Sequence, residues 1–348
     1  MHMADALISP AVGGTMWAVT AGLISYSAKR VKEEKDEAKI PLMGVLGAFI
    51  FAAQMINFSI PATGSSGHLA GGTILAILLG PYAAFLVMAS VLIVQALFFA
   101  DGGLLALGCN IFNMGFFPCF LAYPLIYQKI VNNRPTAKKI LIASLISSIV
   151  SLQLGAFSVV IETVISGISE LPFKVFVLLM QPIHLAIGIV EGLVTAAIVL
   201  FVARLRPELV GIKDNLISVT QVNIKKVLIS LILATIMTAG LISWFASTKP
   251  DGLEWAIFKT SGKEELKPKD DAHDFFAKIQ EKIAFFPDYA FKTNKSEHSE
   301  QEVEVRTTSW PSIDAGTSVS GLVGGAMTFF LVFLIALGLK FRQNKIKS

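Results

Sequence analysis

Residues 69–100 read LAGGTILAILLGPYAAFLVMASVLIVQALFFA, and the number of membrane passes in this stretch decides the fold. A helix needs about 20 apolar residues to cross a bilayer, so the stretch is long enough for one extended span or two shorter ones. Gly80-Pro81 divides it, and this dipeptide is typical of a turn or a helix end. The stretch alone is therefore compatible with one broken span over 69–100 or with separate spans over 69–80 and 82–100.

The chain of 348 residues has the composition of a polytopic membrane protein, with 54% apolar residues and only 16% charged residues. Its mean hydropathy is +0.66, and an ordinary soluble domain carries about 25% charged residues. We therefore predict an all-α integral membrane protein. Outside the first stretch, apolar runs of spanning length occur at 10–28, 40–58, 105–128, 138–162, 175–204, 225–247 and 318–339.

The distribution of Lys and Arg distinguishes between the two topologies, because cytoplasmic loops are enriched in both residues. If 69–80 is a separate span and the N-terminus lies outside, the basic segments all fall inside. These segments carry 5, 4, 5 and 4 basic residues and are 29–39, 129–139, 204–226 and 340–348. We therefore predict nine helices, with the N-terminus outside and the C-terminus inside. The short span over 69–80 must then be shielded by neighbouring helices.

One polar block, residues 247–317, interrupts the apolar pattern and lies outside in this topology. We predict two parts on either side of residue 215. Residues 1–215 form a seven-helix membrane bundle, and residues 216–348 form a two-helix hairpin that carries the polar block as an external loop.

The chain begins MHMADALISPAVGG, without the basic run, short apolar core and cleavage site of a secretory signal. We therefore expect a free α-amine on Met1, next to His2. The Met1 amine, the His2 backbone nitrogen and His2 Nδ1 close a five-membered and a six-membered chelate ring in one plane. Planar nitrogen ligation suits Ni(II) or Cu(II), and the set lacks only a fourth donor.

The segment GSSGHLAGG at 64–72 lies on the same outer side in this topology, and its glycines let the backbone approach other groups closely. His68 is the predicted fourth ligand, at the outer end of the third helix. The alternative is that His2 belongs to a frayed terminus and that His68 is a histidine at the membrane interface.

Four polar residues are predicted to support this site: Asp5, Asn110, Asn113 and His184. Asp5 either accepts a hydrogen bond from a ligand histidine or caps the first helix. His184 shares a helix face with Glu191, and ionisable groups inside a membrane are functional candidates. The alternative for each intramembrane residue is an interhelical hydrogen bond that holds the bundle together.

These motifs resemble the CbiM/NikM family, the substrate-binding (S) components of energy-coupling-factor transporters for cobalt and nickel. The resemblance rests on the initial Met-His, on GSSGHLAGG, on DGGLLALGCNIFNMG at 101–115 and on HLAIGIVEGLVT at 184–195. The hairpin is similar to the CbiN-like PDGLE domain, and the string PDGLE occupies 250–254. Unlike many members, this chain has no Gly after Asp5. The resemblance implies a metal held by the Met1 amine, the His2 amide and imidazole, and the His68 imidazole.

The resemblance implies that the chain binds and imports nickel or cobalt in the cell (inner or plasma) membrane. The chain contains no G-x-x-x-x-G-K-[ST] motif, so we expect ATP hydrolysis on a partner and no catalytic residue here. The expected partners are a membrane-embedded coupling (T) subunit and ATP-binding-cassette ATPase subunits, with no nucleic acid. We expect no resident cofactor, since nickel or cobalt is the transported ligand. Gly14, Ala18 and Gly22 form a stripe that packs either against the coupling subunit or within the chain.

Two other functions are compatible with the sequence. An ion-coupled divalent-metal permease would work without an ATPase. An intramembrane serine protease would use Ser66 with His184 as its base, although the topology places Ser66 in an outside loop. Since all four predicted donors precede residue 216, we expect the hairpin to be dispensable for equilibrium metal binding and to act on loading or coupling.

Overall fold

A computed structural model describes residues 1–34, 39–132, 135–169, 171–210, 224–262, 266, 270–291, 311 and 313–344. Its helices are α1 (Pro10–Glu34), α2 (Lys39–Gln54), α3 (Gly72–Leu79), α4 (Pro81–Phe98), α5 (Leu107–Ile111), the π-helix η2 (Phe112–Tyr127), α6 (Gln128–Val131), α7 (Ala137–Ser166), α8 (Phe173–Leu205), α9 (Ile224–Gly240), α10 (Gly252–Ser261), α11 (Asp271–Ile283) and α12 (Ala315–Asn344). Short 3-10 turns are η1 (Asp5–Leu7), η3 (Pro207–Val210), η4 (Ile242–Phe245) and η5 (Pro287–Tyr289). The strands β1 (Phe58–Ser59) and β2 (Ser66–Gly67) pair antiparallel.

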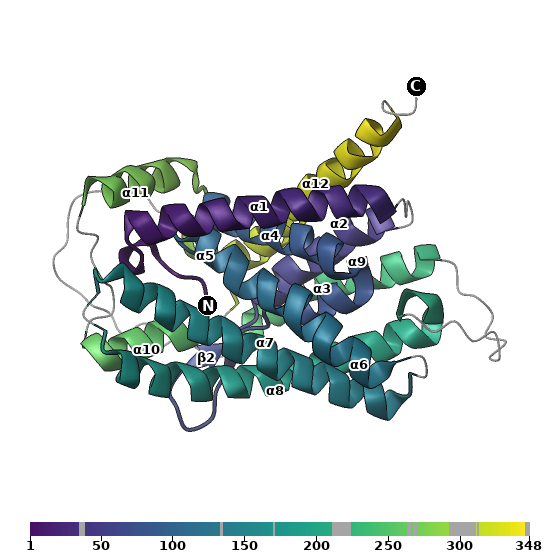
Figure 1. Cartoon of the computed structure of the whole chain (residues 1–348), viewed down its shortest axis with the longest axis horizontal. Helices are drawn as coiled ribbons and strands as arrows, with labels where there is room; N and C mark the ends of the chain where they lie inside the picture. The colour runs from purple at the N-terminus through teal and green to yellow at the C-terminus, as the bar shows by residue number, and fades with distance from the viewer. Residues whose placement is uncertain are drawn as a thin grey trace.

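The long helices lie side by side in one bundle, with α10 and α11 toward its left end in Figure 1. α7 packs along α8, and α1 packs on α4 and α5. The helices of the predicted hairpin, α9 and α12, both pack on α2. The hairpin is therefore part of the same helical assembly as the first seven predicted spans.

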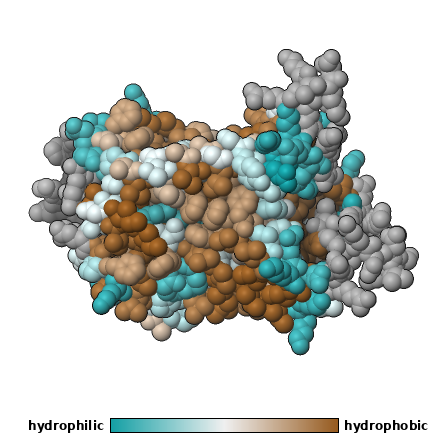
Figure 2. Space-filling view, in the orientation of Figure 1, coloured by the Kyte–Doolittle hydropathy of each residue, from teal (hydrophilic) through white to brown (hydrophobic). Residues whose placement is uncertain are grey.

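Among the described residues, five helical segments are long and apolar enough to cross a membrane: 81–98, 107–131, 137–166, 173–205 and 315–340. α2 is shorter, with 16 residues. Figure 2 shows apolar side chains across the middle of the visible face. The prediction of an all-α membrane protein is confirmed at this level. The seven-plus-two arrangement and its orientation stay a prediction.

The predicted third span is a half-length helix inside the protein. All eight residues of α3 are buried, and at 1.5 Å per residue its length is about 12 Å, far below the roughly 30 Å of a hydrocarbon core. Gly71 precedes it and Gly80 follows it, both with φ of 79°, which glycine adopts without steric cost. α3 is shielded by α4, η2 and α8. Because α3 begins only at Gly72, His68 lies in the preceding loop and not on the third helix.

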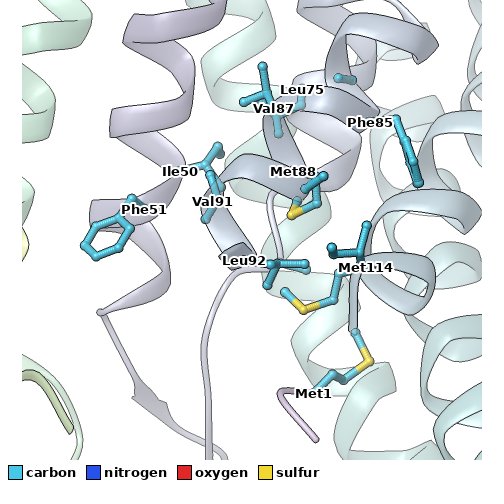
Figure 3. Packing of buried hydrophobic residues seen from close by; sticks show 14 of the residues in the cluster. Met1, Ile50, Phe51, Leu75, Phe85, Val87, Met88, Val91, Leu92 and Met114 are labelled. Atoms are coloured by element: carbon cyan, nitrogen blue, oxygen red, sulfur yellow. The ribbon is translucent and has the colours of Figure 1, made fainter. Parts of the chain in front are cut away.

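The first residues of the chain are packed into the core instead of being frayed. Met3, Leu7 and Ile8 are almost completely buried, and Met1 is only 7% exposed. Figure 3 shows the Met1 side chain beside Met114 at the edge of the buried cluster. This packing fixes the position of the segment that carries His2.

Candidate metal centre

The two predicted ligand histidines lie together on the wall of a cavity between the bundle and the hairpin. The ring centroids of His2 and His68 are 5.2 Å apart. The cavity has a volume of about 710 Å³, and residues from both predicted parts line it. Asp101 and Tyr289 are among them. The fold thus brings the N-terminus, the 64–72 loop and the external loop to one place.

His2 is held by a carboxylate that the sequence analysis did not single out. Its Nδ1 lies 2.5 Å from Asp101 Oδ1, and the Tyr289 hydroxyl donates to Asp101 Oδ2 at 2.5 Å. The other ring nitrogen of His2, Nε2, is buried without a hydrogen-bond partner. Burial would raise the pKa of Asp101, but His2 and the Tyr289 hydrogen bond outweigh burial and hold the pKa well below its usual range. Chelation through Nδ1 requires the bond between His2 and Asp101 to break.

His68 is in the protonation state that a metal ligand needs. Its Nδ1 donates to the carbonyl of Leu69 at 3.1 Å, so Nε2 carries the lone pair in the neutral ring. Burial, together with the nearby Met1 amine and His2, lowers the pKa of His68 to about 4. His68 therefore stays neutral at physiological pH, and protons do not compete with a metal for its Nε2.

The Met1 amine lies beside His68 and an acidic residue of the external loop. The amine nitrogen is 3.7 Å from Asp251 Oδ2. A small void of about 10 Å³ is lined by Met1, His68, Asp251 and His184, among others. This is close to the smallest void that holds one water molecule. Among the described residues, no group of three His, Cys, Asp or Glu side chains is arranged to hold a metal. Such a group is not required here, because two of the four predicted donors are main-chain nitrogens of Met1 and His2.

Asn110 holds the backbone immediately after His2. Its Oδ1 accepts the N–H of Met3 at 2.8 Å, and its Nδ2 donates to the Met3 carbonyl at 3.2 Å. Asp5 has neither of its predicted partners in this structure. Its carboxylate accepts the N–H of Ala106 at 2.9 Å, so it fastens the N-terminal segment to the loop before α5. A role of these two residues in metal binding stays a prediction.

The remaining predicted supports make hydrogen bonds of the kind expected within a bundle. Asn113 donates to Glu162 Oε2 on α7 at 2.7 Å. His184 Nδ1 donates to the carbonyl of Met180, one turn earlier on α8, at 2.8 Å. His184 also lines the small void beside Met1, so its supporting role stays a prediction.

Glu191 has a more direct connection to the His68 loop than its neighbours on α8. It is buried, and its Oε2 accepts the N–H of Ala70 at 2.7 Å. Its carboxylate also interacts electrostatically with the backbone N–H groups of Gly71 and Thr73. These N–H groups open α3 and have no partner inside that helix. Glu191 therefore fixes the loop that carries His68 to the membrane helix α8.

The described part of the 247–317 block docks directly on the segments that carry His2 and His68. The Ser66 N–H donates to the Pro250 carbonyl at 2.8 Å, and the Ser66 hydroxyl donates to the Lys249 carbonyl at 2.7 Å. In the described part of the chain no hydrogen bond joins Ser66 to His184, so the serine hydroxyl has no base. The hairpin thus forms one wall of the cavity. Its dispensability for equilibrium metal binding stays a prediction, because all four predicted donors lie before residue 216.

His273 of α11 provides a second docking contact. Its Nε2 donates to the carbonyls of Asp5 and Ile8, each at 3.0 Å, and its Nδ1 lies 2.7 Å from Asp270 Oδ1. Carbonyl and carboxylate oxygens only accept, so these contacts favour the protonated ring, which donates from both nitrogens. Burial alone would lower the pKa of His273, but the bonds to Asp270, Ile8 and Asp5 raise it above its ordinary value. His298, the other histidine of this loop, lies outside the described residues.

The docking of α11 is therefore expected to weaken at alkaline pH. A raised pKa in the docked state stabilises docking below the ordinary histidine pKa of about 6.5, and this contribution disappears as pH rises through the raised value. Hydrogen exchange of residues 5–9 and 271–283 should speed up over this pH window beyond its intrinsic rate. The variant His273→Gln keeps a donor but no charge, so its docking should not follow pH. An identical pH dependence in wild type and variant would refute this assignment.

Comparison with known families identifies the family of this chain. The sequence model of the CbiM family, described as the cobalt uptake substrate-specific transmembrane region, matches residues 2–209. The chain belongs to the CbiM family. A PDGLE domain matches residues 225–341, so the predicted resemblance to a CbiM-type protein carrying a PDGLE domain is confirmed. As a CbiM family member, the chain is a multi-pass membrane protein of the transporter class and not an enzyme.

Related proteins carry names of nickel and cobalt transporters. A protein of Archaeoglobus fulgidus named for fused nickel transport, NikMN, is 37% identical over 210 residues, which cover 60% of this chain and 68% of that protein. The fused nickel transport protein NikMN of Rhodobacter capsulatus is 30% identical and covers 61% of this chain and 64% of its own. The cobalt transport protein CbiM of Geobacter sulfurreducens is 27% identical, with 61% and 62% covered.

A solved structure supports the same fold for the CbiM part. The crystal structure of a truncated transition metal transporter aligns with a TM-score of 0.52 and 32% sequence identity. The alignment covers 58% of this chain and 98% of the other.

Proposed function

We propose that this chain is the substrate-binding S component of an ATP-driven energy-coupling-factor importer for nickel or cobalt. The observation that carries the proposal is the meeting of His2 and His68, with ring centroids 5.2 Å apart, beside the buried Met1 terminus. Nitrogen donors gathered at one end of an apolar bundle suit capture of a divalent transition metal.

The proposed ligands are the Met1 amine, the backbone nitrogen and Nδ1 of His2, and Nε2 of His68. The His68 ring is neutral before the ion binds, and its hydrogen bond to the Leu69 carbonyl sets its orientation. His2 becomes available when Nδ1 leaves Asp101. Asn110 bonds to the Met3 backbone and so keeps Met1 and His2 positioned beside His68.

The proposed topology has nine passes, with the metal site facing the outside. Residues 1–215 would form the S-component bundle, and 216–348 the PDGLE hairpin with its external loop at 247–317. The basic segments then lie inside, as the distribution of Lys and Arg requires. The metal thus enters at the cavity between the bundle and the external loop.

The proposed partners are a coupling subunit in the membrane and ATPase subunits on the inner side. Gly14, Ala18 and Gly22 on α1 are exposed, whereas Gly13 and Thr20 on the opposite face are buried. A Cβ added at Gly14 or Gly22 would meet nothing within 4 Å. In the part of the chain that the structure describes, the small-residue stripe is left exposed, which suits close contact with a helix of the coupling subunit.

The function is tested by uptake of nickel and cobalt into cells that make the chain with or without its partners. We expect uptake only with the coupling subunit and an active ATPase, and loss of uptake when ATP hydrolysis is blocked. Uptake that persists with the chain alone, driven by an ion gradient, would instead favour an ion-coupled permease. Competition between the two ions for the purified chain would identify the preferred metal.

A further inference from the structure

We propose that Asp251, supplied by the PDGLE hairpin, is the counter-ion of the metal centre and faces the Met1 nitrogen in both the empty and the loaded state. The inference rests on the proposed function and extends it, because residues from both parts of the chain then form the metal site. The four proposed donors all lie in the first part, and Asp251 supplies charge to them from the second.

The Asp251 carboxylate is held in place before any ion arrives. It is the N-cap residue of α10, where Oδ1 accepts the N–H of Glu254 at 2.8 Å. Glu254 completes the capping box by accepting the N–H of Asp251 at 3.0 Å. One carboxylate oxygen is therefore used by the helix, and the other, Oδ2, faces the Met1 amine at 3.7 Å.

The backbone around Asp251 is fixed against the His68 loop. Pro250 accepts the Ser66 N–H, and Asp251 forms a parallel bridge with Ser66. The next residue, Gly252, packs so closely on α8 that an added Cβ would lie 2.5 Å from Ile183 Cγ2. The close packing of α10 on α8 thus depends on the absence of a side chain at Gly252. This packing sets the distance between Asp251 and the Met1 amine.

The position of Asp251 suits a counter-ion for the incoming metal. An ion bound by the Met1 nitrogen would lie next to Asp251 Oδ2, which is 3.7 Å from that nitrogen. A buried divalent cation needs more compensating negative charge than the single amine that it replaces, and a buried charge without a partner is costly. Removal of the carboxylate should therefore weaken binding of the ion.

The matched variants are Asp251→Asn, Asp251→Ser and, as a control, Asp314→Asn. Asn and Ser are both good N-cap residues, so the first two variants remove the charge and keep the helix cap. Asp314 is an exposed carboxylate before α12, in the same part of the chain, and its Oδ1 accepts the N–H of Gly316 at 2.9 Å. It lines neither cavity, so the control removes a helix-capping charge away from the proposed site.

Equilibrium binding of Ni(II) and Co(II) to the purified full chain, together with thermal unfolding, tests the proposal. We expect both Asp251 variants to unfold cooperatively, which shows that they are folded, and to bind the ions about tenfold more weakly, in the range for partners outside the ligand set. The Asp314 variant should bind as tightly as wild type. Wild-type affinity in the Asp251 variants, or an equal loss in all three, would overturn the assignment. A wild-type chain that binds neither ion would instead refute the proposed function.

Discussion

A chain extended by a single residue before Met1 is expected to lose high-affinity nickel and cobalt binding, although every side chain of the site remains. The extension turns the amine into an amide and moves His2 from the second to the third position, so both fused chelate rings are lost. Burial adds to the effect, because Met1 is 7% exposed and its nitrogen faces Asp251. An added residue must displace this packing or carry a buried polar group without a partner.

Calorimetry on three preparations tests this expectation, after mass spectrometry has established the first residue of each. The preparations are the untagged chain, the chain with an N-terminal tag and the chain with a tag after residue 348. We expect binding in the first and third only. Removal of the N-terminal tag should restore binding only if the cut leaves Met1 at the terminus. Native affinity in an intact N-terminal extension would show that the Met1 amine is not a ligand.

His2→Ala and His68→Ala are each expected to abolish high-affinity binding. Each substitution removes one of four donors, so the loss of metal affinity should exceed the roughly 100-fold loss that is the upper limit for a residue that only contacts a ligand. Thermal stability should change little for His68, whose described hydrogen bond joins it to the adjacent Leu69.

The visible absorption of bound Ni(II) provides a second readout, since it reports planar nitrogen ligation. Cys119→Ala is a suitable control. Cys119 is free and buried and lines neither cavity, so the substitution removes a possible soft metal ligand away from the proposed site. Retained affinity together with an unchanged spectrum in either histidine variant would remove that residue from the ligand set.

The helices and the meeting of the N-terminus with the 64–72 loop follow from local sequence features. Apolar runs mark the long helices, and the basic segments require a separate element over 69–80. The true extent of α3 was less predictable, because its eight residues depend on burial by α4, η2 and α8 and not on their own length. His2 was accessible to stereochemical reasoning, because its chelate rings depend only on the order of atoms along the chain, whereas His68 was predicted from the topology of the 64–72 segment.

Asp101, Asp251 and Tyr289 were not predicted as site residues, because their positions depend on docking between distant segments. The pattern D-x-x-E at 251–254 is a capping-box signal that places a helix start there, but it carries no information about what the cap faces. Asp5 illustrates the same limit, since its carboxylate bonds to the backbone of Ala106, far along the chain.

The burial of the first residues against residue 251 has a consequence for biosynthesis. The cavity walls around Met1 and His2 include residues of α10 and α11, which lie in the last third of the chain. Contacts between segments so distant in sequence form late in folding, because closing a long loop costs entropy. The contacts of Met1 and His2 with these helices can therefore form only when the last third of the chain is present. A metal site completed by Asp251 would then exist only in the assembled polypeptide.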